Sequence, residues 1–493
     1  MAASSPVSSA LASQRWRRGA LLAAILLIGA RLAWVESRVM EILPDDVVLM
    51  NGSARIAAGS WGQIWAPKDI HFIPLYRLLR LPFDLHFPAW YVRFHAVLLA
   101  AHLASAAILY LLARRSLRSP WAALVTAMLF AWSTVGDEAL VWKAAAPFAL
   151  SWTFLLLALY GLTQRGKGWT AGAAAALLAA VGFFSGALFV IPGVLLGAWL
   201  LGPPDRDARR RALGVCFGVW LAGSLTWLVL VAAEPVLAHY WTVGAPGVAV
   251  LPRLVWAAED TVHSYAYQFA VGARLLPERF LFWLLLLPVM ALLLLRRWVQ
   301  WRWILTFFVM TAPMLFVIVL IRREHDVWKI SRYCYQGYTF WIAVIGSLFD
   351  ALLWRLEPQP RWRRALLGIS PLLAAGYLAG HYLVVRHHRD YFSRQAIMSQ
   401  QFWFGWDHFF RAASAHRAEI GRPLRLPFLE VLPGLNLHVI YRMCEPGGLP
   451  GLLAEHGAVG TPEERDQFWQ ELDRAHVHLP GFEQHRPPRR VTP

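Results

Sequence analysis

Acidic and imidazole side chains gather early in the chain, in a polar stretch from Met40 to Phe87. They are Asp45, Asp46, Asp69, His71 and Asp84. Since the chain is 58% hydrophobic, such a loop suggests general acid–base chemistry or the binding of a polar ligand. The plainer interpretation of Pro44-Asp45-Asp46 is a solvated turn, because Pro-Asp is common in turns. Both interpretations stay open for these two aspartates.

Three other sets of polar residues are candidates for ligand binding. Asp69 and His71 would bind an acceptor or assist a base, and Glu138 and Lys143 lie in a second polar connection. Each of these residues is alternatively an ordinary polar surface residue.

A third polar segment, 322–333, carries Arg322, Arg323, Lys329 and Arg332. Guanidinium and ammonium groups are the usual partners of phosphate. Alternatively, these side chains reach toward the membrane surface and pair with the acidic residues of the same segment. We favour phosphate binding most at Arg332.

Membrane-spanning helices must position these residues. Only 16% of the 493 residues are charged and 26 are Trp, which excludes an ordinary soluble domain. A span needs roughly 20 apolar residues, and the sequence offers about eleven such runs. They lie near 18–37, 89–113, 119–135, 145–163, 168–183, 185–202, 212–233, 280–296, 303–321, 333–354 and 365–385. We therefore expect an all-α polytopic membrane protein, with 168–202 the least clearly divided region.

Basic residues indicate the orientation of these spans. They cluster in every second connection, near 15–18, 114–118, 165–167, 206–211, 296–302 and 355–364. Lys and Arg stay on the cytoplasmic side, so we expect a cytoplasmic N-terminus and an external C-terminus. The formal charge of +17 is then a topology signal, and nucleic acid is not an expected partner.

Four connections and the tail are then external. They are 38–88, 136–144, 234–279, 322–332 and the chain after about 386. All the candidate residues named above lie on that face. We expect 1–17 to be a cytoplasmic tail, 18–385 the transmembrane domain, and 386–493 a small, mostly helical external region with a disordered end.

Two features of the membrane domain have open interpretations. His95 and His102 share one helix face, where they would line a path for a lipid phosphate or simply pack with satisfied hydrogen bonds. The segment 72–81 is either an interfacial helix with Arg77 and Arg80 among lipid phosphates, or a cap on the bundle. Cys216, Cys334 and Cys444 lack metal-ligand spacing, and no metal site is expected from them.

Several segments together resemble a known family. They are KDIHFIPLYRLL, WYVRFHAVLLAAHLASAAILYLLARR, FAWSTVGDEALVWKAAAPFAL and SRYCYQGYTFWIAVIGSLF. Their order over residues 18–385 resembles the GT-C superfamily of integral membrane glycosyltransferases, of the bacterial type that uses polyprenyl-phosphate sugars. The similarity to the TMTC-like O-mannosyltransferases is more distant, because the chain lacks their His-Pro pair and repeat array.

The resemblance implies a reaction and roles for residues. A sugar would pass from a polyprenyl-phosphate donor to a glycan, lipid or protein acceptor on the external face of a bacterial inner membrane. Asp45 or Asp46 would be the base, and Arg332-Tyr333 would bind the donor phosphate; Lys329 is a further candidate because of its charge in the same segment. The resemblance makes no cofactor certain, and a divalent metal stays an open question.

Other classes of membrane protein share parts of this pattern. A flippase or other transporter of lipid-linked glycans would be polytopic but would show internal repeats and broken helices. An O-antigen-type polymerase or ligase would also use an external loop and arginines, although its largest loop comes late. A relative that binds substrate without catalysis is a further alternative.

Overall fold

The fold is that of a computed structural model of the whole chain. The structure describes residues 6–37, 49, 52–53, 55–57, 59–66, 71–86, 93–133, 135, 138–141, 143–202, 205–232, 250–269, 278–322, 331–380 and 383. By its internal contacts the chain divides into two units, one of 1–38 with 52–387 and one of 39–51 with 388–493. The helices and contacts described below all belong to the first unit.

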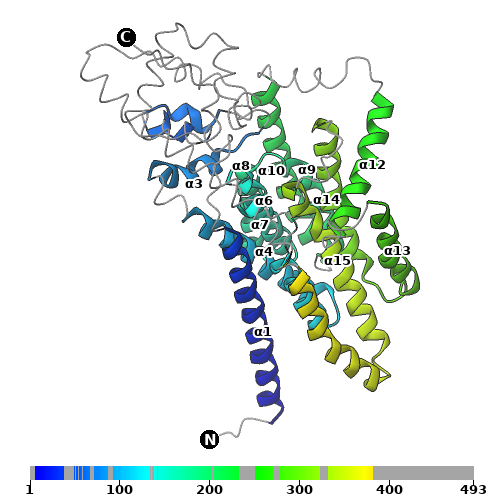
Figure 1. The fold of residues 1–493 in the computed structure, drawn as a ribbon. Helices are drawn as coiled ribbons and strands as arrows, with labels where there is room; N and C mark the ends of the chain where they lie inside the picture. Colours follow the sequence, from blue (N-terminus) through cyan, green and yellow to red (C-terminus); the bar gives the residue numbers. More distant parts are fainter. Residues whose placement is uncertain are drawn as a thin grey trace, which may run out of the picture. The chain divides into compact units, whose positions relative to one another are not determined.

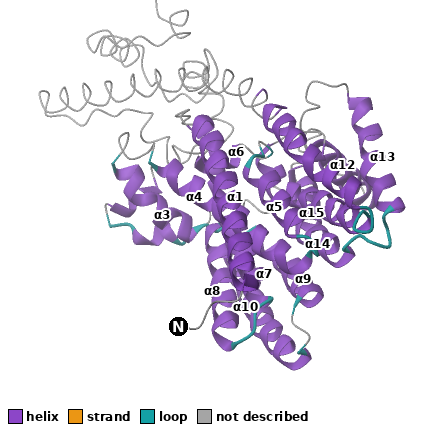
Figure 2. Ribbon diagram, turned by 90° about the horizontal axis from the view of Figure 1, so that it is seen from below, coloured by secondary structure: helices purple, strands orange, loops and turns teal. Residues whose placement is uncertain are grey.

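The described residues form helices and no strand (Figures 1 and 2). In chain order they are α1 (Pro6–Ser37), η1 (Trp61–Ile64), α3 (Pro74–Leu85), α4 (Phe94–Ser116), α5 (Pro120–Ala131), α6 (Glu138–Val141), η2 (Lys143–Ala145), α7 (Ala146–Leu162), α8 (Lys167–Phe183), α9 (Ala187–Leu201), α10 (Arg206–Ala232), α12 (Val250–Phe269), α13 (Glu278–Leu294), α14 (Trp301–Arg322) and α15 (Ser331–Arg355). A further helix covers 360–380.

A helix lies in every range predicted to cross the membrane. Among the described residues, five helices are long and apolar enough to span: Phe94–Ser116, Lys143–Leu162, Arg206–Leu230, Trp301–Leu320 and Cys334–Arg355. The predicted helical fold is thus confirmed and the five helices support the predicted membrane protein, whereas the count of about eleven spans stays a prediction. The expected division of 168–202 is confirmed as well, because α8 ends at Phe183 and α9 begins at Ala187.

One end of the bundle is made by its basic turns, and we call it the basic end (turns 117–119, 163–166 and 295–300). Arg115 donates to the carbonyl of Thr163, and Arg118 donates to that of Trp298. The buried Asp350 of α15 accepts from the backbone N–H of Ser119 at 2.6 Å. These bonds join three connections and helix α15, which are far apart in sequence.

Arginines at this end also stack on aromatic rings. Arg118 lies 4.9 Å from the ring centre of Trp354, and Arg355 lies 5.2 Å from that of Trp298. Such pairs suit a membrane interface, where an aromatic body and a cation share a partly dry environment. The predicted pattern of basic turns therefore has a structural counterpart at one end of the bundle.

The helix α12 was missed by the sequence reasoning, which placed 234–279 in an external connection. It packs against α14 and α15: the Tyr265 hydroxyl shares a hydrogen bond with Thr311, and the Trp341 indole donates to the Tyr265 carbonyl. Its polar residues Ser264 and Gln268 are buried. Because they face neighbouring helices rather than lipid, they lower the hydropathy of α12 without making it a surface segment.

Candidate functional site

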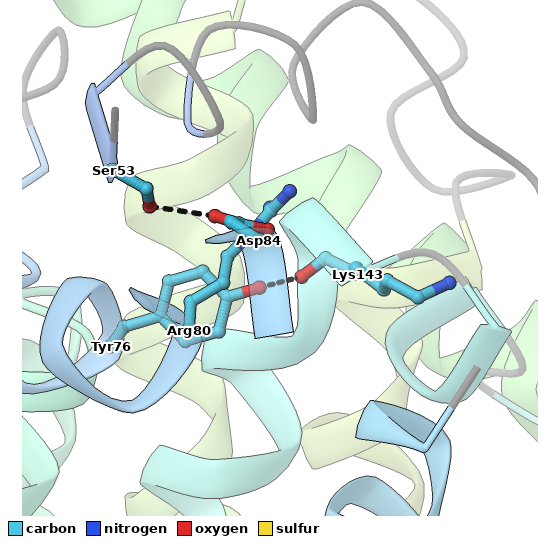
Figure 3. Close-up of polar contacts among 5 residues, drawn as sticks. All are labelled: Ser53, Tyr76, Arg80, Asp84 and Lys143. Carbon is cyan, nitrogen blue, oxygen red and sulfur yellow. Dashed lines mark hydrogen bonds and ion pairs between the residues drawn. The ribbon is translucent and has the colours of Figure 1, made fainter. Parts of the chain in front are cut away.

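Three segments meet at the end of the bundle opposite the basic turns. We call this the loop end, and it comprises the described residues of 53–86, the first turn of α4 and the described residues of 138–145. The Tyr76 hydroxyl of α3 donates to the backbone carbonyl of Lys143 (Figure 3). The ring of His95, at the start of α4, contacts the Leu140 carbonyl through Nδ1 at 3.4 Å. The predicted first loop and the 138–145 connection are therefore neighbours.

The helix α3 turns its polar side chains inward. Tyr76, Arg80 and Asp84 recur every four residues, so they share one face, and all three are buried. The Arg80 guanidinium donates through Nε to both Asp84 oxygens, at 2.9 and 3.0 Å. Ser53 donates to the same carboxylate at 2.7 Å (Figure 3).

This geometry excludes one of the two interpretations of Arg80, its placement among lipid phosphates. A side chain that is only 1% exposed and paired within its own helix does not lie among lipid phosphates. Asp84, one turn later, provides the countercharge that makes burial of the guanidinium tolerable. Arg77 does not reach outward freely either, because it donates to the Gln63 carbonyl.

Lys143 is the buried cation of the site. It is 0% exposed, and its ammonium lies 3.1 Å from Nε2 of His95, which is 1% exposed. Since an ammonium can only donate, Nε2 must accept, and the ring proton sits on Nδ1, facing the Leu140 carbonyl. The contact thus fixes His95 as a neutral imidazole of one tautomer. Figure 3 shows the ammonium directed away from the Arg80–Asp84 pair.

His102 lies two turns further along α4 and has a packing role. Its Nδ1 is 3.1 Å from the Tyr335 hydroxyl, its Nε2 is 3.4 Å from the Ala131 carbonyl, and its ring stacks on Phe130 at 4.9 Å. Both ring nitrogens are satisfied and the side chain is buried. This favours the packing interpretation of His102 over a lining for a lipid path.

Of the predicted site residues, Lys143 and His71 have described side chains. The half-buried His71 ring lies 5.1 Å from that of Phe184, and the N–H of the next residue, Phe72, donates to Ser185 at 3.1 Å. These contacts join the segment that begins at His71 to the junction between α8 and α9.

The remaining predicted residues are only partly covered or not covered by the structure. Glu138 begins α6, and Arg332 and Tyr333 lie in the first turn of α15, but their side chains are not described. Asp45, Asp46, Asp69 and Lys329 lie outside the described residues. The assignments for all seven stay predictions.

Sequence reasoning missed most of the buried polar groups at the loop end. Tyr76, Arg80, Asp84 and Ser53 were not proposed as a unit, and His95 was not paired with Lys143. The spacing of Arg80 and Asp84 within an amphipathic stretch was the available signal. No sequence rule links His95 with Lys143, because they belong to different helices.

The described part of the chain holds no cluster of three or more His, Cys, Asp or Glu residues that could bind a metal ion. Cys216 and Cys334 are buried free thiols. The groups that the loop end does offer are an ammonium, a neutral imidazole and a neutralised ion pair, all desolvated. Searches against protein families and curated proteins found no match to this chain.

Proposed function

We propose that this protein transfers a sugar from a polyprenyl-phosphate donor to an acceptor at the external face of a bacterial cell membrane. The observation that carries the proposal is the position of Lys143: a fully buried ammonium at the loop end, held on the first loop by Tyr76 and on α4 by His95. Desolvation strengthens the attraction of such a cation for an anion.

The proposed chemistry assigns complementary roles to the loop residues. Asp45 or Asp46 takes the proton of the acceptor hydroxyl or amine while the acceptor atom bonds to the anomeric carbon. The bond between that carbon and the phosphate oxygen breaks, and polyprenyl phosphate leaves. Lys143, with Arg332, Tyr333 and Lys329, stabilises the charge that accumulates on the phosphate.

In the same proposal, other residues on the external face bind the acceptor. Asp69, His71 and Glu138 would hydrogen-bond acceptor hydroxyls and orient the attacking atom. The donor enters from the membrane, so lipid is a further partner. Only one of the adjacent aspartates is expected to face the donor, because successive side chains point in different directions.

The test is a transfer assay with the full chain in nanodiscs. Purified polyprenyl-phosphate hexoses and pentoses are supplied with glycan, lipid and peptide acceptors, and release of polyprenyl phosphate is followed by mass spectrometry. We expect the double variant Asp45→Asn/Asp46→Asn to lose about 100-fold or more of the rate, the usual loss on removal of a general base. Wild-type rates in that double variant would refute the assignment of the base.

Lysine variants test the phosphate role with a matched pair. Lys143→Met should lower the transfer rate by about 100-fold, as loss of a buried electrostatic contact does. Lys167→Met, at the exposed first residue of α8, should leave it unchanged. Membrane abundance and melting temperature of both variants separate lost catalysis from lost folding. Movement of the intact donor across the membrane without release of polyprenyl phosphate would instead identify a flippase.

A further inference from the structure

The outward face of α3 is apolar along its whole length. Leu75, Leu78 and Leu85 are 37%, 41% and 49% exposed, and Pro82 between them is exposed too. Their spacing of three, four and three residues places them on one side of the helix. We call these four residues the outer stripe.

The outer stripe carries no charge, because the charged residues of α3 are used elsewhere. Arg80 and Asp84 are buried and paired with each other, and Arg77 donates to the Gln63 carbonyl. This is the reverse of a helix on a soluble domain, which buries its leucines and exposes its charges. A partner recognised through charge has nothing to bind on this face.

Apolar surface continues from the outer stripe in two directions. Next to α3, η1 exposes Trp61 by 61%, and the residue that follows η1, Trp65, is 60% exposed. On the other side α3 packs on α8, where Gly182 lies directly against Leu75. One turn from this glycine, Leu178 is 56% exposed on a predicted span. The apolar surface of a span therefore passes into that of the loop.

We propose that α3 and η1 form a membrane-inserted platform. The outer stripe lies among the acyl chains of the leaflet at the loop end, and the two tryptophans sit at the level of the headgroups, where indoles prefer to be. The opposite, polar face of α3, which includes Tyr76, then faces Lys143. This inference does not depend on sugar transfer.

Photocrosslinking in nanodiscs tests the platform with the full chain. Separate variants carry p-benzoylphenylalanine in place of Leu78 or Leu85, and mass spectrometry identifies what each one captures. Leu178 serves as the lipid-facing control, and Arg165, exposed in a basic turn, serves as the aqueous control. We expect phospholipid adducts at 78 and 85 within about threefold of those at 178, and about tenfold above those at 165.

Two results would overturn the proposal. Lipid adducts at 78 and 85 no more abundant than those at 165 would place the outer stripe in water. Crosslinks from these positions to peptides of 388–493 would show that the tail of the chain covers the stripe instead. Since the readout is a covalent adduct, loss of transfer activity in these variants would leave the result unaffected.

Discussion

At the scale of single residues, the loop end contains buried charged side chains. Each one contacts either a side chain of opposite charge or a neutral polar group. Arg80 is held by Asp84, which also accepts from Ser53. Lys143 is held by a neutral His95. Such groups stabilise a fold only while the partners remain together, because an isolated buried charge is costly.

The Arg80–Asp84 pair should therefore show strong coupling. Asp84→Leu leaves the Arg80 guanidinium without its carboxylate in a buried position, and we expect it to lower the free energy of unfolding by about 3 kcal/mol. The double variant Arg80→Met/Asp84→Leu removes both charges and should recover most of that loss. Unfolding of the four members of the cycle in detergent measures the coupling.

Simple additivity of the two substitutions would contradict this account. Arg297→Met provides a matched control, since Arg297 is exposed in the 295–300 turn and should change stability by less than about 0.5 kcal/mol. The same control reports any general effect of adding a methionine to the chain.

The role of a residue could be predicted from sequence only where its side-chain type and its position along the chain were enough to indicate that role. Lys143 was selected because a cation in a polar connection is conspicuous, and the structure places it at the loop end. For Arg80 the sequence left two interpretations open, and its placement among lipid phosphates is wrong, because the direction of this side chain depends on how α3 packs. The His95–Lys143 contact joins two helices, and helix periodicity says nothing about such pairs.

At the scale of elements, close packing of α9 against α14 depends on glycine. A Cβ on Gly193 would lie 2.2 Å from the carbonyl oxygen of Val309, and one on Gly197 would lie 2.5 Å from Cγ2 of Thr306. Small residues allow membrane helices to approach this closely, and the gain is dispersion energy between backbones. The obstacle at Gly193 is backbone, which no side-chain rotation can move.

Gly193→Ala should consequently destabilise the bundle. Forcing α9 and α14 apart should lower the free energy of unfolding by about 2 kcal/mol, as overpacking does in tight interiors. Gly172→Ala is the matched control, because a Cβ on Gly172 of α8 would meet nothing within 4 Å. Thermal unfolding in detergent compares the two, and equal melting temperatures would refute the close packing at Gly193.

The positions of the helices were predictable to a large extent. Long apolar runs predicted a helix in each range, and the weak division at 183–186 falls where α8 ends and α9 begins. Hydropathy works here because lipid requires apolar side chains and internally bonded backbones. It fails for α12, whose buried Ser264 and Gln268 resemble the residues of a surface loop.

At the scale of the whole molecule, the basic end and the loop end differ in chemistry. Arginines and aromatic rings join the turns at the basic end, whereas the loop end holds the buried Lys143 and the buried Arg80–Asp84 pair. The positive-inside rule assigns the basic end to the cytoplasm. Hydrogen bonds between the basic turns support their location at one end of the bundle. The assignment of that end to the cytoplasm is a prediction from the sequence.

Cysteine labelling in intact cells tests the direction of insertion. A membrane-impermeant maleimide should react with His86→Cys, exposed at the end of α3, without permeabilisation. It should react with Arg165→Cys and Arg361→Cys, both at exposed positions, only after the membrane is opened. All three variants are made in a Cys444→Ser background, because Cys444 lies in the region predicted to be external, whereas Cys216 and Cys334 are buried; the Cys444→Ser chain alone supplies the control. The opposite labelling pattern would reverse the topology.

The bonds around Asp350 have a mechanical consequence. Because Asp350 binds the N–H of Ser119, and Ser347, one turn before it, accepts from the N–H of Gln300 at 2.8 Å, the helices α5, α14 and α15 are pinned at their basic ends. Helices fixed at one end can separate only by swinging at the other. Any substrate that separates these helices would therefore leave their basic ends in place, and the widest movement would occur at their opposite ends.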